Sequence, residues 1–385
     1  MNRRHDIDAL RAIAFGLLIA YHLAMFYVAD WRWHIKSEHL SEFLQVPMLF
    51  VNRWRMDLIF MISGISAAFM WKSDRVLAFF KQRSKRLLLP LLFGCLVVVP
   101  VQPYCQGVSN GLVEPGFVQF LYRYYVGYEW PKDAFNGWKH SFTWNHLWYL
   151  VYLYLYTVVL VLIHKPLASR AGKTLEQTFT NLRGWRLLIW PAAPFLIYTV
   201  LLQPHFPNNN GLTKDWYAHA TYFTMFLLGF WLAKSGGLWN ELRRLRQVSL
   251  AVALFAYLFY LLTRIGANDE SGIHEILPIW VFRNLYMWAA LCTIFGWSFH
   301  LLNRPLRWLP WANEAVYPWY ILHQSAIVLF GYWLIPLKLG AIAEPIVLTV
   351  GTVLACWALT SGLIQRVRWL RPLFGLKTVG HPHTA

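Results

Sequence analysis

The chain has 385 residues, of which 57% are hydrophobic and only 14% are charged. Soluble domains carry roughly 25% charged residues, so this composition, with apolar runs of membrane-spanning length, excludes a soluble globular enzyme and a disordered chain. The net charge of +17 and the mean hydropathy of +0.38 instead predict a basic, polytopic membrane protein.

The apolar runs predict an all-α bundle of about ten transmembrane helices, because a helix needs about 20 residues to cross the hydrocarbon core. The expected spans lie near residues 10–29, 53–71, 86–104, 146–164, 186–203, 217–234, 248–264, 278–300, 315–337 and 345–365. We expect the first run to be a retained membrane helix and not a cleaved signal peptide, since Arg11 and His22 interrupt it. We predict one membrane domain over 1–385, with a core of about 5–370 and a short cytoplasmic tail at 371–385.

The distribution of Lys and Arg predicts the orientation. With the N-terminus in the cytoplasm and ten spans, the cytoplasmic segments carry 24 Lys and Arg and the opposite segments carry 10. Cytoplasmic loops are enriched in these residues, so both termini are expected to face the cytoplasm. The positive charge then reflects orientation and attraction to anionic lipid, and we expect no nucleic-acid partner.

The first helix carries ionisable residues, which are costly inside a membrane and are therefore functional candidates. Asp8 and Arg11 are three residues apart and can meet on one helix face. Arg11 and His22 are eleven residues apart, close to three turns, so they share a stripe and lie about 16 Å apart along the axis. A snorkelling arginine and a packing histidine are the structural alternatives.

The second span begins with charged residues, Arg53, Arg55 and Asp57. A charge pair at that depth usually faces the bundle interior. Gly64, in the same span, allows close approach of a neighbouring helix.

A basic cluster containing Arg83, Lys85 and Arg86 precedes the third span. Arg83 and Arg86 fall on one helical face. Paired guanidinium groups suit a phosphate-bearing ligand, because each can bind phosphate through two hydrogen bonds. Anchoring at the cytoplasmic surface is the alternative interpretation.

A long outer segment, about 105–145, is rich in aromatic residues and leads into the fourth span. His146 lies at the start of that span, between Trp144 and Trp148. These tryptophans suit either stacking on sugar faces or an interfacial aromatic belt.

The late spans carry further polar residues. Arg283 lies within the eighth span and can bind a carboxylate or form a structural pair. His323 and Gln324 lie inside the ninth span, where both side chains need hydrogen-bonding partners.

Familiar motifs of soluble enzymes are absent from the sequence. It has no P-loop, no H-E-x-x-H, no G-x-S-x-G and no dinucleotide fingerprint, so ATP hydrolysis and zinc chemistry have no motif to support them. The four cysteines have no metal-type spacing and are expected to be buried free thiols. We therefore expect no metal site.

These motifs resemble acyltransferase family 3, a family of integral membrane O-acyltransferases. The resemblance is carried, in order, by Ile7 to Arg11, the R-x10-H spacing to His22, the run from Phe60 to Gly64, Arg83 to Arg86 and Pro90. Within the family, the chain is most similar to the branch that modifies periplasmic glucans, through His146 to Leu150, Tyr320 to Gln324 and Gly331 to Leu334. The resemblance covers about residues 5–370.

The resemblance implies an inner-membrane enzyme that moves a succinyl or acetyl group from cytoplasmic acyl-CoA to a hydroxyl of a periplasmic glucan or another envelope carbohydrate. His22 would act as general base or carry the acyl group, and Asp8 would orient Arg11. The phosphates of CoA would be held by Arg11, Arg83, Lys85 and Arg86. The expected substrate contacts are Arg55, Asp57, Trp144, His146, Trp148, Arg283 and His323.

Two other classes remain open from the residues alone. Intramembrane His, Arg and Asp also suit a proton-coupled transporter or exporter, although no inverted repeat is visible. The unrelated membrane-bound O-acyltransferases would instead place an essential histidine in a late span, where His323 is the candidate. Separate substitution of His22 and His323 distinguishes these enzyme classes.

Overall fold

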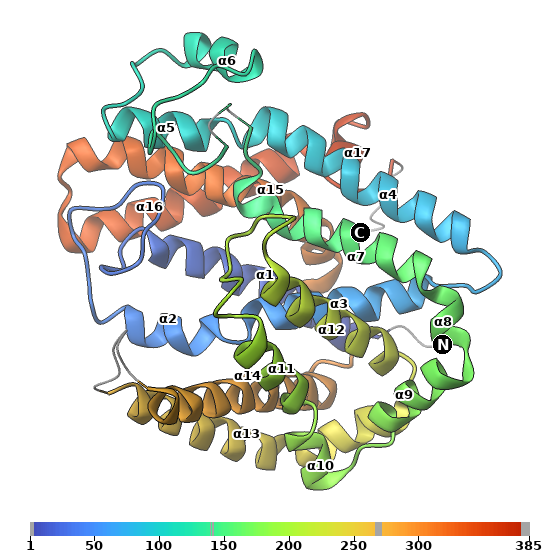
Figure 1. Ribbon diagram of the computed structural model, residues 1–385. Helices are drawn as coiled ribbons and strands as arrows, with labels where there is room; N and C mark the ends of the chain where they lie inside the picture. Colours follow the sequence, from blue (N-terminus) through green and yellow to red (C-terminus); the bar gives the residue numbers. More distant parts are fainter. Residues whose placement is uncertain (1–3, 139, 141, 266–271, 379–385) are drawn as a thin grey trace. The chain divides into compact units, whose positions relative to one another are not determined.

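The computed structural model describes residues 4–138, 140, 142–265 and 272–378 (Figure 1). These residues form helices and no strand, apart from one isolated β-bridge between Val28 and Ser41, so the predicted all-α class is confirmed. Of the predicted tail at 371–385, residues 379–385 lie outside the described part.

Each of the ten predicted spans coincides largely with helix, although the helix in the first span runs from His5 to Met25 and not from 10 to 29. Eight helical segments of the described chain are long and apolar enough to cross a bilayer. These eight are His5–Met25, Val76–Ser109, Asn145–Leu162, Gly184–Leu201, Gly236–Arg264, Ile273–Leu301, Leu309–Leu337 and Gly340–Ile364. The other two are α3 (Arg55–Met70) and α12 (Trp216–Leu232), with 16 and 17 residues. At 1.5 Å per residue these helices are about 24 and 26 Å long, shorter than the roughly 30 Å hydrocarbon core. The count of ten spans and the cytoplasmic termini stay predictions.

The chain divides into two compact units. Unit 1 contains the described residues of Met1–Ala14, Leu49–Phe80 and Leu155–Leu309. Unit 2 contains those of Phe15–Met48, Lys81–Tyr154 and Pro310–Ala385. The boundaries fall inside five helices, which are α1 (His5–Met25), α2 (Gln45–Asn52), α4 (Val76–Phe93), α7 (Trp148–Leu162) and α15 (Leu309–Leu334), of which only Leu309 belongs to unit 1. The single membrane domain stays a prediction.

Unit 1 is built on two helix pairs, α3 with α12 and α13 (Gly236–Arg264) with α14 (Ile273–Leu301). Figure 1 shows α13 and α14 side by side along most of their length. Shorter helices complete the unit, namely α8 (His164–Ala168), α9 (Arg170–Thr180), α10 (Gly184–Ile189) and α11 (Ala192–Leu201).

Helices α3 and α12 approach each other closely at two glycines. A Cβ atom on Gly64 would lie 1.8 Å from the carbonyl oxygen of Phe226, and one on Gly229 would lie 2.0 Å from that of Met61. Both distances are far inside van der Waals contact, so only glycine fits at this crossing. The close approach expected at Gly64 is confirmed.

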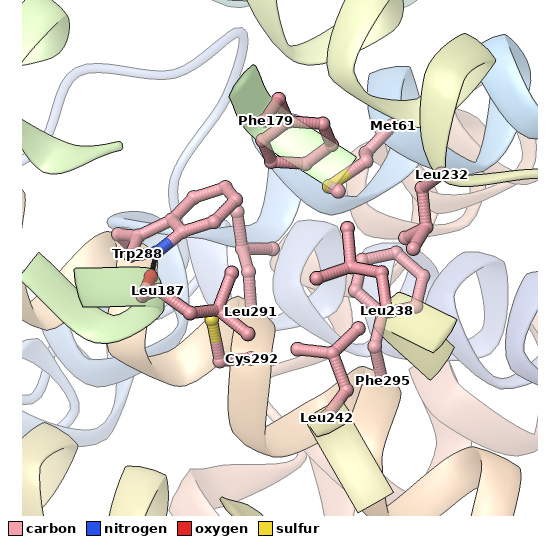
Figure 2. Close-up of a pocket in the computed structure, with 10 residues that line it drawn as sticks. All are labelled: Met61, Phe179, Leu187, Leu232, Leu238, Leu242, Trp288, Leu291, Cys292 and Phe295. Atoms are coloured by element: carbon pink, nitrogen blue, oxygen red, sulfur yellow. Dashed lines mark hydrogen bonds between the residues drawn. The ribbon is translucent and has the colours of Figure 1, made fainter. Parts of the chain in front are cut away.

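The core of unit 1 is apolar and dense. Figure 2 shows ten side chains around a residual gap of about 10 Å³, among them Met61, Phe179, Trp288 and Phe295. The indole nitrogen of Trp288 donates to the carbonyl oxygen of Leu187 at 2.7 Å, which satisfies its one polar group. A gap of this size holds about one water-sized sphere and has no polar lining, so it is a packing defect and not a ligand site.

Unit 2 contains the remaining parts of α1, α2, α4 and α7. Its other elements are η1 (Gly94–Val98), α5 (Val101–Ser109), α6 (Phe117–Tyr125), η2 (Asn145–Leu147), α15 (Leu309–Leu334), η3 (Ile335–Leu337), α16 (Gly340–Trp357), η4 (Ala358–Ile364) and α17 (Leu370–Leu373). The aromatic outer segment forms a small cluster of its own, in which Phe120 packs against Trp130 and against Tyr104 of α5. All four cysteines of the chain are buried free thiols, as predicted.

Candidate active site

Two histidines of unit 2 are joined directly, although they are far apart in the sequence. Nδ1 of His22 on α1 lies 2.8 Å from Nε2 of His323 on α15. The two ring planes are 2° from parallel and their centroids are 5.0 Å apart. His323 is completely buried, whereas His22 is only partly buried.

The backbone of α15 fixes the protons of this pair. Nδ1 of His323 lies 3.0 Å from the carbonyl oxygen of Trp319 and 2.8 Å from that of Tyr320. Carbonyl oxygens only accept, so Nδ1 of His323 carries the proton and its Nε2 is an acceptor. His22 therefore donates from Nδ1, and Nε2 of the neutral His22 ring is left as the basic nitrogen.

A buried network of amides surrounds the pair in unit 2. His146 donates from Nε2 to the carbonyl oxygen of Ile321 at 3.1 Å, and its Nδ1 accepts from Gln102 at 3.2 Å. Gln102 also donates to Ser325 at 2.8 Å and accepts from Asn145 at 2.9 Å. Each group has a consistent donor or acceptor role, so the network is ordered and holds α5, η2 and α15 in register.

The network continues into the loop that follows α1. Gln324 donates to Gln102 at 3.0 Å and to Nε2 of His34 at 2.9 Å. His34 in turn donates from Nδ1 to Gln106 at 2.9 Å. Burial lowers the pKa of His34 to about 4, and the hydrogen bond to Gln106 opposes part of that shift. His34 is therefore neutral at pH 7, as its acceptor role at Nε2 requires.

The two predicted partners of His22 lie in unit 1. Nη1 of Arg11 lies 3.4 Å from Oδ1 of Asp8, so the expected contact within α1 is present. Nη2 of Arg11 donates to the hydroxyl of Ser66 on α3 at 2.8 Å. Ser66 donates onward to the carbonyl oxygen of Ile62, which fixes the hydroxyl as an acceptor for the guanidinium.

Arg11 also lines a cavity of about 850 Å³ in unit 1. The wall is formed by the start of α1, the C-terminal ends of α3 and α14 and the connection between α12 and α13. Lys234 adds a second cation, and Trp71, Trp239 and Phe299 add aromatic faces. Arg4 lines the cavity too, but its guanidinium pairs with Asp6 at 2.6 Å. The cavity size falls within the roughly 300–1,000 Å³ typical of ligand pockets.

A second cavity of unit 1, of about 280 Å³, is lined by the N-terminal ends of α3 and α12, the middle of α14 and the segment that follows α11. The predicted substrate residues Asp57 and Arg283 lie on its wall with Arg53. Arg55 lies between Arg53 and Asp57 in the sequence. It is buried, with 8% of its surface exposed, and is not part of the cavity lining. The structure thus brings together Asp57 and Arg283, which are 226 positions apart in the chain.

The basic cluster of α4 belongs to unit 2. Arg83 is buried, whereas Lys85 and Arg86 are exposed, so Arg83 and Arg86 do not present one uniform surface. The carbonyl oxygen of Arg86 accepts a hydrogen bond from the hydroxyl of Tyr317 at 3.3 Å. A role for Arg83, Lys85 and Arg86 in holding donor phosphates stays a prediction.

The two candidate tryptophans of unit 2 are partly exposed. Trp144 contacts Phe142 edge to face, with ring centroids 6.4 Å apart. Trp148 contacts Tyr152 in the same way, with centroids 5.0 Å apart. Both rings therefore have an aromatic neighbour of their own, and their contact with a sugar stays a prediction.

Sequence reasoning missed the neutral members of the polar network, Gln102, Gln106 and His34. None of these three side chains is charged at pH 7, so none stands out in the charge pattern of the sequence. The signal was present, because Gln102 interrupts an apolar run that begins before residue 90. An intramembrane amide needs a partner just as a charged group does.

Within the described residues, no three His, Cys, Asp or Glu side chains gather in a way that could hold a metal ion. The histidines of unit 2 are instead hydrogen-bonded to one another, to amides and to backbone carbonyls. This arrangement suits proton transfer.

The fold is that of a protein with several membrane-spanning helices, and the comparisons with known proteins give its family. Residues 4–361 match the family described as an acyltransferase domain, so the chain belongs to acyltransferase family 3. It is similar to the glucans biosynthesis protein C of Escherichia coli strain K12 / DH10B, with 24% identity over 362 residues, 87% of this chain and 84% of that protein.

Other strains carry similar relatives. The protein of the same name from Escherichia coli O157:H7 is 22% identical over 355 residues, with the same shares of both chains covered. That from strain SMS-3-5 / SECEC is 24% identical over 362 residues. No solved structure matches the chain. The resemblance to the acyltransferase family is therefore confirmed, and the chain is an acyltransferase with membrane helices.

Proposed function

We propose that this acyltransferase moves an acyl group, succinyl or acetyl, from cytoplasmic acyl-CoA to a hydroxyl of a periplasmic glucan or another envelope carbohydrate, in the inner membrane. The relatives named for glucan biosynthesis support the acceptor class. The single observation that carries the chemistry is the His22–His323 hydrogen bond, which makes Nε2 of His22 a proton acceptor.

In the proposed reaction, Nε2 of His22 takes the proton of the acceptor hydroxyl while the hydroxyl oxygen attacks the thioester carbonyl carbon. The C–S bond then breaks, and the leaving CoA thiolate takes that proton from His22. Both sides of the reaction balance: an ester and a free thiol form from a thioester and an alcohol. His323 accepts from Nδ1 of His22 throughout and stabilises the imidazolium that forms between the two steps.

The donor would bind through the 850 Å³ cavity of unit 1. Two of its cations, Arg11 and Lys234, suit the phosphates of CoA, and its aromatic faces suit an adenine ring. Because α1 is one continuous helix, it carries both Arg11 and His22, about 16 Å apart along its axis at 1.5 Å per residue.

The proposal is tested with purified full-length protein in lipid nanodiscs. Acyl-CoA labelled in its acyl group is mixed with purified periplasmic glucan, and label in the glucan and free CoA thiol are counted. The proposal predicts equal amounts of both, with neither formed by His22→Ala. CoA release without label in the glucan would contradict the acceptor. Transfer at the full rate by His22→Ala would contradict the base.

A further inference from the structure

The second cavity of unit 1 has the composition of a ligand site. Its wall carries Arg53, Asp57 and Arg283, together with the hydroxyl of Tyr217 and the amides of Gln203 and Asn284. Two guanidinium groups against one carboxyl group leave a net charge of at least +1 in a part-enclosed space. Transfer chemistry at His22 uses none of these residues.

The guanidinium of Arg283 is held in place by one of its three nitrogens. Nη2 donates to the hydroxyl of Thr199 at 2.9 Å, to Oε1 of Gln203 at 2.8 Å and to the hydroxyl of Tyr217 at 3.2 Å. Among the described residues, no carboxylate forms an ion pair with Arg283. Nη2 is thus fixed within the protein, and Nε and Nη1 remain as two separate donors that point in different directions.

The cavity also contains polar atoms with unmet hydrogen-bonding capacity. Asp57 is only 6% exposed, and its Oδ1 has no hydrogen-bond partner among the described residues. The same holds for Nε of Arg53, whose guanidinium lies 5.4 Å above the ring of Tyr260. A buried polar atom without a partner costs roughly 1–3 kcal/mol, so a bound ligand that pairs with these atoms would stabilise the unit.

We infer that this cavity binds a small hydroxylated carboxylate of monosaccharide size. The net positive charge of the wall favours an anion and matches the single charge of a carboxylate, whereas a phosphate monoester carries roughly two negative charges at pH 7. Nε and Nη1 of Arg283 are separate donors for its oxygens. The free Oδ1 of Asp57 requires a hydroxyl beside the charged group. The volume of 280 Å³ equals about nine water molecules at about 30 Å³ each, enough for one hexuronate ring.

The test is equilibrium binding to the full chain in nanodiscs, with no acyl donor present. D-Glucuronate, D-glucose and glucose 6-phosphate are compared at matched ionic strength, since they share a ring and differ in charge. We expect a Kd for glucuronate at least tenfold lower than for glucose. Equal affinities for glucuronate and glucose, or no binding of glucuronate, would overturn the inference. Tighter binding of glucose 6-phosphate would overturn its assignment to a carboxylate.

Variants locate the binding in the cavity. Arg283→Gln is expected to weaken glucuronate binding at least tenfold, whereas Arg186→Gln, with the same charge change at an exposed position outside the cavity, leaves it unchanged. Wild-type affinity in Arg283→Gln would place the ligand elsewhere and overturn the inference.

A second variant covers the case in which Arg283→Gln fails to fold. Asp57→Asn keeps the side-chain shape and removes the competing carboxyl group, so glucuronate is expected to bind at least as tightly as to wild type. A tenfold loss of glucuronate binding in Asp57→Asn would overturn the inference, because removing a negative charge from the wall should strengthen the binding of an anion. Because the assay needs no acyl transfer, its failure is separable from failure of the proposed function.

Discussion

The hydrogen bond between His22 and His323 gives the sharpest prediction, because it assigns the two histidines different roles. His323 is a positioning residue, since it acts through His22, and His22 is the base. Replacement of His323, which is 0% exposed, by leucine removes the side chain that accepts the hydrogen bond from Nδ1 of His22.

The size of the effect follows from that lost bond. Hydrogen bonds to charged groups contribute about 1.5–3 kcal/mol, and the imidazolium exists only during the reaction. At 1.36 kcal/mol per tenfold, His323→Leu should lower kcat by about 10- to 150-fold with an unchanged KM for the donor. His323→Gln should recover most of this loss, because its Oε1 can accept from His22. His22→Ala should lose about 100- to 10,000-fold.

Initial rates of labelled acyl transfer, measured in nanodiscs at several donor concentrations, separate kcat from KM. Melting temperatures of the same preparations control for misfolding. If His323→Leu keeps the wild-type kcat, the hydrogen bond has no part in catalysis. If His22→Ala keeps activity while both His323 variants lose it entirely, His323 is the base and the assignment of roles is reversed.

Three further predictions concern packing, pH and donor binding. Gly64→Ala places a methyl group 1.8 Å from a backbone oxygen, which should cost about 1–3 kcal/mol or more and lower the Tm by several degrees. In the control, Gly16→Ala, the new Cβ would meet nothing within 4 Å, so the Tm should not fall. Equal Tm values for the two variants would refute the close helix contact. The unfolded chain protonates His34 near its ordinary pKa of about 6.5, whereas the folded chain protonates it only near a pKa of about 4. The free energy of unfolding should therefore fall by up to roughly 3 kcal/mol as the pH drops through that window. If a His34→Gln protein has the same slope of Tm against pH as wild type, another group titrates. Lys234→Gln should raise the KM for the donor about tenfold, because a contact with a phosphate is lost. Lys85→Gln should leave this KM unchanged. The reverse result would show that the donor binds at the basic cluster of α4.

Local geometry was predictable from the sequence wherever it depends on one helix. The contact between Asp8 and Arg11 follows from their spacing of three residues, and the structure contains it. The end of α3 was predicted to within a residue of the observed one, because the apolar run stops where Trp71 adopts an extended backbone. Gly64 was identified as a place of close packing, although its partner Phe226 was not.

The remaining parts depend on which helices meet, and periodicity within a single helix does not contain that information. His22 and His323 are 301 positions apart, and each alone was compatible with a packing role. Gln102 carries no charge, so it did not stand out from its apolar run, yet it contacts His146, Ser325 and Gln324. The spacing of charged residues also favoured a donor site at Arg83 and Arg86, and gave no sign of the cavity that Arg11 shares with Lys234.

The most direct test of the central claim, that His22 is the base of an acyl transfer to an envelope carbohydrate, is the mass of the product in cells. Wild type and His22→Ala are expressed at equal levels in a host that lacks its own glucan acyltransferase, and its periplasmic glucans are weighed by mass spectrometry. The account predicts added succinyl or acetyl mass with wild type and none with His22→Ala. Added acyl mass with both proteins would show that His22 is not the base, and its absence with both would show that the glucan is not the acceptor.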